Sequence, residues 1–289
     1  MLKFLTASSS GHLRGSRAAA ARFLSTAASA VPKVTTLFHY DTFTPTYIVS
    51  CPNTRKAAVI DSVLDFDFSS GRISFDHNDK TLEAIEKDDL EVEWVLETHV
   101  HADHLTGSKF LREALRSKGH RAYTGIGERV VEVQRVFKQM FNLGEEFKTD
   151  GSQFGQLFTD GYSAMIGDVS FKVMSTPGHT PACVTYLIGD AAFVGDTYFF
   201  PDFGTARCDF PGGSAEEMYQ SLSKLMSLPE ETRLFVGHDY LPNGREAMWE
   251  TTVGEQKRSN IHMREGVSEE VSTFAPCTAS ATPFMMGPL

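Results

Sequence analysis

The residues with the clearest capacity for chemistry lie in THVHADHLTG, which spans positions 98–107. Within it, His99, His101, Asp103 and His104 fall in six consecutive positions. A turn can direct several such side chains to a single point, whereas a regular helix or strand would distribute them around its axis. Imidazole and carboxylate groups together suit Zn, Fe or Mn. The segment therefore predicts a metal site rather than a set of surface or core histidines.

Three more potential ligands stand where predicted strands end elsewhere in the chain. They are His179, which follows a predicted strand at 169–176, Asp196, which ends AAFVGD, and His238, which ends RLFVGH. Strand ends within one sheet lie close together, and loops at strand ends commonly carry binding sites. Residues far apart in sequence are therefore expected to converge on one edge of a sheet.

Alternating strands and helices must position these residues, and they follow one another from about Val34 onward without a repeat or a low-complexity linker. Short apolar runs predict strands at 57–61, 92–98, 169–176, 183–189, 191–197 and 233–238. Apolar residues at helical spacing predict helices at 78–90, 104–119, 127–141, 214–228 and 247–263. Ser214 and Glu217 have the spacing of a capping box, which predicts that a helix begins there.

The composition is that of an ordinary globular protein. The chain has 289 residues, of which 41% are hydrophobic and 22% charged, and no apolar run is long enough to predict a membrane span. Four scattered cysteines form no CxxC pair, which predicts separate thiols in a reducing compartment: Cys51, Cys183, Cys208 and Cys277.

Residues 1–30 differ from the rest of the chain. They are rich in Ser and Ala and carry four basic and no acidic side chains, a composition typical of a mitochondrial transit peptide. The alternative is an extension without structure or function. Removal of the four basic residues takes the formal charge from −10 to −14. So large a negative charge on the rest of the chain argues against nucleic acid as a partner, because no basic surface is available to bind phosphates.

The motifs THVHADH, STPGHT, GDT and VGHDY, in this order, resemble those of the metallo-β-lactamase superfamily over nearly all of residues 34–265. The resemblance implies an α/β fold, a four-layer αβ/βα sandwich with the metal at the sheet edge, and leaves 266–289 as a C-terminal tail. It also implies three groups of ligands: His99, His101 and His179 at a first metal position, Asp103, His104 and His238 at a second, and Asp196 between them.

Within the superfamily, three features resemble the bacterial-type persulfide dioxygenases. Arg207 and Asp209 form the R-x-D pair that this branch shares with glyoxalase II, and Tyr240 follows His238 as it does in the dioxygenases. Only 51 residues follow His238, which is short for the helical domain that holds glutathione in glyoxalase II. The resemblance implies an enzyme without the rhodanese domain that some of these dioxygenases carry.

This branch holds one Fe(II) per chain through the equivalents of His99, His179 and Asp196, with His101 adjacent. Such a 2-His-1-carboxylate face leaves positions open for water, O₂ and substrate. The resemblance therefore implies oxidation of glutathione persulfide by O₂ to sulfite and glutathione, in mitochondrial sulfide catabolism in the matrix, by an enzyme that is commonly a homodimer. A di-zinc thioester hydrolase of the glyoxalase II type would carry the same ligands and is the alternative.

Each supporting residue has a functional and a structural interpretation. Tyr240 would hydrogen-bond the substrate or be a core tyrosine, and Arg207 would orient the site through Asp209 or form a structural ion pair. Asp61 resembles a carboxylate that supports the ligands in this superfamily, and it could equally be a turn residue. Cationic partners for the glutathione carboxylates are sought on the flanking helices, where the candidates, which could also be solvated surface charges, are Arg135, Lys138 and Arg258.

Other classes fit less well. A β-lactamase is not expected to carry the leader or the R-x-D segment, and a nuclease would need a basic surface. A non-enzymatic binding module would be expected to have lost ligands, and all seven remain.

Overall fold

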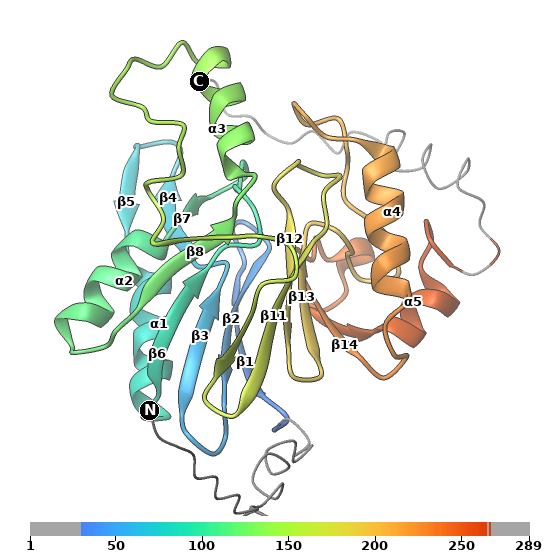
Figure 1. Cartoon of the computed structure of the whole chain (residues 1–289), viewed down its shortest axis with the longest axis horizontal. Helices are drawn as coiled ribbons and strands as arrows, with labels where there is room; N and C mark the ends of the chain where they lie inside the picture. Colours follow the sequence, from blue (N-terminus) through green and yellow to red (C-terminus); the bar gives the residue numbers. More distant parts are fainter. Residues whose placement is uncertain (1–29, 265, 267–289) are drawn as a thin grey trace, which may run out of the picture.

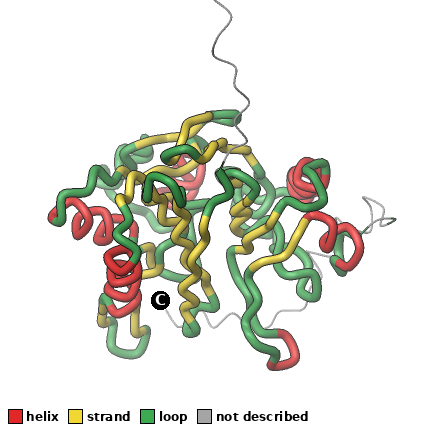
Figure 2. Tube along the Cα trace, turned by 90° about the horizontal axis from the view of Figure 1, so that it is seen from below, coloured by secondary structure: helices red, strands yellow, loops and turns green. Residues whose placement is uncertain are grey.

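The computed structural model describes residues 30–264 and residue 266. Two six-stranded sheets pack face to face, and helices cover their outer faces (Figure 1). Seen along the other direction, the helices lie at the periphery and the strands in the interior (Figure 2). The predicted four-layer α/β sandwich is therefore confirmed. The predicted transit peptide and C-terminal tail lie outside the described residues except for residues 30 and 266.

The first sheet has the strand order β1-β2-β3-β6-β8-β9. Its strands are β1 (Lys33–His39), β2 (Thr44–Ser50), β3 (Lys56–Ile60), β6 (Glu91–Leu96), β8 (Tyr123–Gly127) and β9 (Gln156–Phe158). A small sheet at its side has the order β5-β4-β7, with β4 (Val63–Asp67), β5 (Arg72–Ser74) and β7 (Leu105–Thr106). The helices of this half are α1 (Asp76–Lys87), α2 (Ser108–Ser117) and α3 (Val130–Met140).

The second sheet runs in sequence order from β10 to β15. Its strands are β10 (Ser163–Ile166), β11 (Val169–Ser175), β12 (Val184–Ile188), β13 (Ala191–Gly195), β14 (Arg233–Val236) and β15 (Glu250–Thr252). The helices of this half are α4 (Ala215–Met226), α5 (Val253–Ser259) and the short 3₁₀ helix η1 (Pro242–Gly244). Among the described residues, no helix is long and apolar enough to cross a membrane.

Alternation along the strands explains why the sheets are covered on both faces. Tyr47 of β2 and Phe235 of β14 point into the core between the sheets, whereas Ile48 points to the layer formed with α1 and α2. Leu234 points outward to the layer formed with α4. Successive side chains of a strand face opposite ways, so a strand that is covered on both sides, such as β3 or β13, is apolar on both faces. The Tyr47 hydroxyl also donates to the carbonyl of Val236 over 2.6 Å, which links the two sheets.

The predicted strands are confirmed to within two residues at each end. The helix predicted at 104–119 begins only at Ser108, because residues 105–106 pair with β4 as strand β7. The prediction of one long helix at 247–263 was wrong. Residues 247–249 are irregular, residues 250–252 form β15, which pairs with β14, and only 253–259 are helical. Hydrogen bonding to a neighbouring strand outweighed the local helical spacing, and the side chain of Thr252 then caps the short helix.

Helix α4 begins as its sequence predicts, because the Ser214 side chain accepts a hydrogen bond from the Glu217 backbone N–H over 3.2 Å. Loss of such a cap costs about 1 kcal/mol. We therefore expect Ser214→Ala to lower the free energy of unfolding by about 1 kcal/mol in urea denaturation. Ser223→Ala, at an exposed position inside the same helix, is the control. It should not lower the free energy of unfolding, because alanine is the better helix former. Equal losses in the two variants would contradict the capping role.

Candidate metal centre

The potential ligands lie at one edge of the sandwich, where strands of both sheets end. His99 follows β6 of the first sheet, and His179, Asp196 and His238 follow β11, β13 and β14 of the second. The two sheets are joined there by a backbone hydrogen bond of 2.9 Å from Val184 to Thr98. The predicted convergence of strand ends on one edge is therefore what the structure shows.

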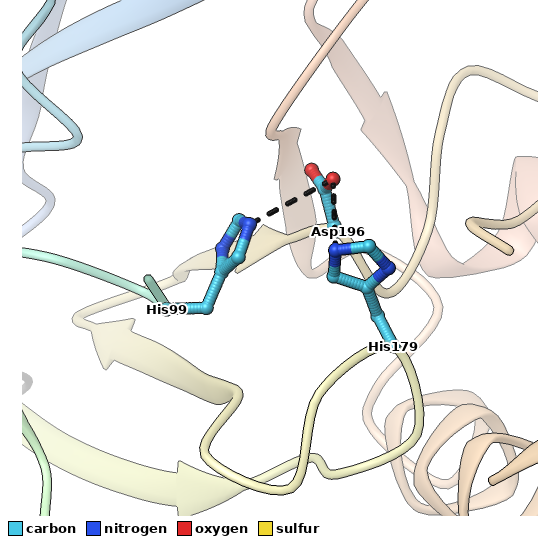
Figure 3. Close-up of side chains that lie close together, drawn as sticks. All are labelled: His99, His179 and Asp196. Carbon is cyan, nitrogen blue, oxygen red and sulfur yellow. Dashed lines mark ion pairs between the residues drawn. The ribbon is translucent and has the colours of Figure 1, made fainter. Parts of the chain in front are cut away.

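One group of three is compact. The Nε2 atoms of His99 and His179 lie 3.8 and 3.7 Å from the same carboxylate oxygen of Asp196, Oδ2 (Figure 3). These distances are too long for hydrogen bonds. They suit three ligand atoms that each lie about 2 Å from one metal ion. His99, His179 and Asp196 thus form a face of two imidazoles and one carboxylate.

A second group lies beside the first. His238 Nε2 is 3.3 Å from Asp103 Oδ2 and 3.5 Å from Asp196 Oδ1. The two oxygens of Asp196 therefore face different groups, as its expected place between two metal positions implies. His101 groups with Asp103 and His238 rather than with His99. In the described part of the chain, His104 joins neither group of three, although its ring centroid is 4.3 Å from that of His101.

The hydrogen bonding of these side chains indicates whether they suit a cation. Five buried side-chain atoms at this edge lack a hydrogen-bond partner: His101 Nδ1, Asp103 Oδ2, His104 Nε2, Asp196 Oδ1 and His238 Nε2. Buried polar atoms without a partner are rare and costly. All five are lone-pair donors of the kinds that bind Zn or Fe. The residues present therefore fit one or two metal ions.

The remaining ring nitrogens are held by neighbouring oxygens, which sets which nitrogen faces the metal position. Four histidines use Nδ1 in this way and leave Nε2 for the metal: His99 to Thr98 Oγ1 (3.0 Å), His104 to the Leu105 carbonyl (3.0 Å), His179 to the Arg207 carbonyl (2.9 Å) and His238 to Thr44 Oγ1 (3.2 Å). His101 has the opposite orientation. Its Nε2 contacts carboxylates, and its Nδ1 has no hydrogen-bond partner.

Two buried carboxylates hold His101. Its Nε2 lies 3.2 Å from Asp61 Oδ1 and 3.1 Å from Glu97 Oε2. Asp61 also accepts hydrogen bonds from the N–H and hydroxyl of Thr98, and the hydroxyl of Thr106 donates to Glu97. Asp61 thus contacts both Thr98 and His101, and its φ of +51° also makes it a turn residue at the end of β3, so both of its predicted roles fit its place. The sequence analysis missed Glu97, although an acidic residue directly after the apolar strand WVL was a usable signal.

Burial and neighbouring charge set the protonation of this edge. Burial, together with the nearby imidazoles of His101 and His238, lowers the pKa of His104 to about 3. Burial also lowers the pKa of His99, again with help from the other histidines. Burial alone would raise the pKa of Asp103, but the histidines around it outweigh this effect and hold its pKa at about 2. Near neutral pH the imidazoles of His99 and His104 are neutral and Asp103 is ionised, which is the form that binds metal. His101 differs, because Asp61 and Glu97 outweigh the effect of burial and raise its pKa well above its usual value.

Two glycines allow the close packing that places the ligands. Gly195 precedes Asp196 with φ +49°, and a Cβ there would lie 2.4 Å from the Thr98 hydroxyl. Gly178 precedes His179 with φ +148°, and a Cβ there would lie 2.4 Å from the Cα of Met218 in α4. A side chain at either position would push a ligand loop away from the edge.

Arg207 and Asp209 form a two-pronged ion pair, with Arg207 Nη2 2.6 Å from Asp209 Oδ2. Both side chains are exposed, and the hydrogen bonds from Arg207 lower the pKa of Asp209. The link to the ligands is the backbone, because the Arg207 carbonyl accepts from His179. This carbonyl contact would be made by any residue at position 207, and the Arg207–Asp209 pair itself faces outward, so the orienting role of the Arg207 side chain stays a prediction.

Tyr240 lies against the second group. Its ring stacks on that of His238, with centroids 5.5 Å apart and planes 17° apart. It also packs edge-on against Phe199 and tilted against Phe203. Burial, together with the charges of Asp196 and Asp103, raises the pKa of Tyr240 well above its usual value. Its phenol is therefore a protonated hydrogen-bond donor beside the ligands.

The candidate glutathione-binding cations lie on two different helices. Arg135 is exposed on α3. Lys138 pairs with Glu145 over 3.4 Å. Arg258 folds back toward Gly254 at the start of α5. That start lies beside the N-terminal end of β14, opposite the end that carries the ligand, because Val253 donates to the Thr232 carbonyl.

Two stacked sheets between helices, with imidazoles and carboxylates gathered at one edge, define a metal-dependent enzyme of the α/β sandwich class. Residues 39–238 match the family described as the metallo-beta-lactamase superfamily. The chain belongs to this superfamily, as its motifs implied.

Curated relatives carry several names. The beta-lactamase hydrolase-like protein of Agrobacterium fabrum is 46% identical over 252 residues, which cover 87% of this chain and 57% of that protein. The chain thus spans little more than half the length of this relative. Glyoxylase B2 of Dictyostelium discoideum is 47% identical over 224 residues, which cover 77% of this chain and 75% of that protein.

Similarity to persulfide dioxygenases is lower. The mitochondrial persulfide dioxygenase ETHE1 of Bos taurus is 28% identical over 241 residues, which cover 82% of this chain and 78% of that protein. The crystal structure of ETHE1 from Myxococcus xanthus matches with a TM-score of 0.66 and 30% identity, and the match covers 84% of this chain and 89% of that one. The superfamily is confirmed, and the dioxygenase branch is one of several that the chain resembles.

The contact between Glu97 and His101 predicts a measurable effect on metal binding. Glu97→Gln replaces the carboxylate by a weaker acceptor, so His101 becomes a less basic and less well-oriented ligand. We expect the Zn²⁺ affinity, measured by competition with a coloured chelator, to fall about tenfold or more. Glu93→Gln is the control, because Glu93 lies on the same strand, β6, and pairs with Lys56 instead. Equal affinities in the two variants would remove Glu97 from the metal centre.

Proposed function

We propose that the protein is an Fe(II)-dependent persulfide dioxygenase that oxidises glutathione persulfide with O₂ in the mitochondrial matrix. The observation that carries the proposal is the separate face of His99, His179 and Asp196, because two imidazoles and one carboxylate are the ligand set of many non-haem Fe(II) oxygenases. Similarity to the persulfide dioxygenases supports it, and so does the placement of Tyr240 against His238.

The net reaction is balanced by one water. Glutathione persulfide, O₂ and water give glutathione, sulfite and two protons. Iron held by His99, His179 and Asp196 would supply the redox chemistry that lets O₂ react with sulfur. The protein binds the persulfide with its outer sulfur toward this face and its peptide toward the exposed Arg207 side of the edge.

The surrounding side chains orient the reactants and limit the access of water. The Tyr240 hydroxyl donates a hydrogen bond to the substrate, which its raised pKa allows at all physiological pH values. Phe210 covers His179, with ring centroids 5.8 Å apart, and packs on Phe137 of α3. These rings give the sulfur an apolar wall. Arg207 keeps His179 directed at Asp196 through its carbonyl.

A zinc-dependent thioester hydrolase is the second candidate, and one observation favours it. The second group keeps unpartnered ligand atoms on His101, Asp103 and His238, as a two-metal site requires. A relative named Glyoxylase B2 is also 47% identical. Two zinc ions would supply Lewis acidity and an activated water for hydrolysis. The two candidates therefore differ in metal identity and count, and in the need for O₂.

The first test is metal content with oxygen uptake. We expect residues 31–289 to contain about one iron per chain by elemental analysis, and to consume O₂ on addition of glutathione persulfide with sulfite as product. His179→Ala should lose iron and activity together. His120→Asn is the control, because this histidine accepts from Val92 N at the other end of β6. Two zinc ions per chain and no oxygen uptake would refute the dioxygenase and favour the hydrolase.

The hydroxyl of Tyr240 is tested by removing it alone. Tyr240→Phe keeps the ring that stacks on His238, so iron content should stay unchanged. We expect kcat/KM for persulfide-dependent oxygen uptake to fall about 10- to 100-fold, the effect of losing one hydrogen bond to a charged group. An unchanged kcat/KM would make Tyr240 a packing residue.

A further inference from the structure

We propose that Arg245 is a positioning residue that ties together the loops after β13 and β14 and so fixes His238 and Tyr240 relative to Asp196. Figure 1 shows β13 and β14 side by side, and they pair in parallel, so their following loops leave the same edge. The activity measurement that tests this proposal rests on the proposed function, whereas the hydrogen-exchange measurement does not.

Arg245 uses all of its hydrogen-bond donors. A guanidinium group has five N–H bonds in a rigid plane. Nε and Nη2 donate to the two oxygens of Asp202 over 2.7 and 2.9 Å. Nη1 and Nη2 donate to the two oxygens of Asp239 over 2.6 and 2.8 Å, and Nη1 also donates to the carbonyl of Glu246 over 3.0 Å. The group lies over the ring of Phe200 at 5.0 Å.

Asp239 connects this arrangement to the metal centre. It stands between His238 and Tyr240, and its side chain is fully buried. Its backbone N–H donates to the Phe43 carbonyl, and its carboxylate accepts from the backbone N–H of Met248 over 2.6 Å. A buried carboxylate needs a paired cation, and Arg245 supplies it. The orientation of the peptide on each side of Asp239 therefore depends on this ion pair.

Asp202 connects the same guanidinium to the loop that follows Asp196. Phe200 and Phe203 belong to this loop, and Phe203 packs on the ring of Tyr240 with centroids 5.1 Å apart. Arg245 thus holds the two sides of the Tyr240 environment at a fixed separation. Lysine could not replace it, because one ammonium cannot form two planar two-pronged pairs at once.

The backbone between Tyr240 and Arg245 needs such a restraint. Leu241 has φ +51° and Asn243 has φ +59°, so two residues other than glycine are left-handed within three positions. Such conformations persist where the surrounding structure holds them. In this loop the fixed points are Asp239 and Arg245, which are joined to each other.

Arg233 provides a matched control at the opposite end of β14. It pairs with Asp190 through two nitrogens, over 2.9 and 3.1 Å, and lies 3.6 Å from Glu250. Its guanidinium is 5.4 Å from the ring of Phe235, and its side chain is 24% exposed against 19% for Arg245. The two arginines have similar partners and burial, but only Arg245 contacts the ligand loop.

The test compares Arg245→Lys with Arg233→Lys in two measurements. Hydrogen exchange of the metal-free protein is followed for the peptide 238–248, which contains the amides of Asp239 and Met248. We expect this exchange to accelerate about tenfold or more in Arg245→Lys and to stay unchanged in Arg233→Lys. In the iron-loaded protein, we expect kcat to fall about tenfold in Arg245→Lys but not in Arg233→Lys. The iron content and KM should stay nearly unchanged in both variants.

Asp202→Asn is the second variant, in case Arg245→Lys does not fold. Asp202 is partly exposed, and its loss leaves the pair between Arg245 and Asp239 in place. It should shift both readouts in the same direction by a smaller factor. Equal effects of the lysine variants at Arg245 and Arg233 would overturn the proposal and make Arg245 a general stabilising residue. If the wild-type protein shows no oxygen uptake, the proposed function fails, and the hydrogen exchange still decides the role of Arg245.

Discussion

A set of buried ligand atoms that no hydrogen bond satisfies is the constraint on which this structure depends. Imidazole nitrogens and carboxylate oxygens of His101, Asp103, Asp196 and His238 face one region without hydrogen-bond partners. Bringing such atoms together is unfavourable unless a cation occupies the space between them. The fold must therefore hold these groups in place against their own tendency to separate or to bind water. Much of the architecture at this edge serves that requirement.

The fold meets the requirement by holding the far side of each ligand. Threonine hydroxyls and backbone carbonyls fix the outer ring nitrogens, as Thr44 does for His238 and the Arg207 carbonyl does for His179. Such contacts choose which nitrogen faces the metal and make the ligand more basic. Hydrogen bonds between the sheets, such as that of Tyr47 with Val236, keep the strand ends in register. Ligand geometry is thus a property of both sheets together.

The chemistry that this edge performs depends on how many ions it holds. The face of His99, His179 and Asp196 is complete by itself, and the second group shares Asp196 with it. A single iron would leave His238 and Asp103 as polar groups beside the substrate, whereas a second ion would engage them as ligands. The same side chains would therefore serve oxidation with one iron or hydrolysis with two ions, and the relatives of the chain include a beta-lactamase hydrolase-like protein and a persulfide dioxygenase.

The candidate ligands could be predicted from the sequence, because their residue types and their places at strand ends are local features. The tertiary structure alone decided how they group, since His101 turns toward Asp61 and Glu97 instead of joining His99. It also decided that residues 250–252 form a strand, because β14 lies beside them. Partners such as Thr44 and His238 are 194 positions apart. No local pattern encodes such a contact, because it arises only when two sheets pack and bring their edges together.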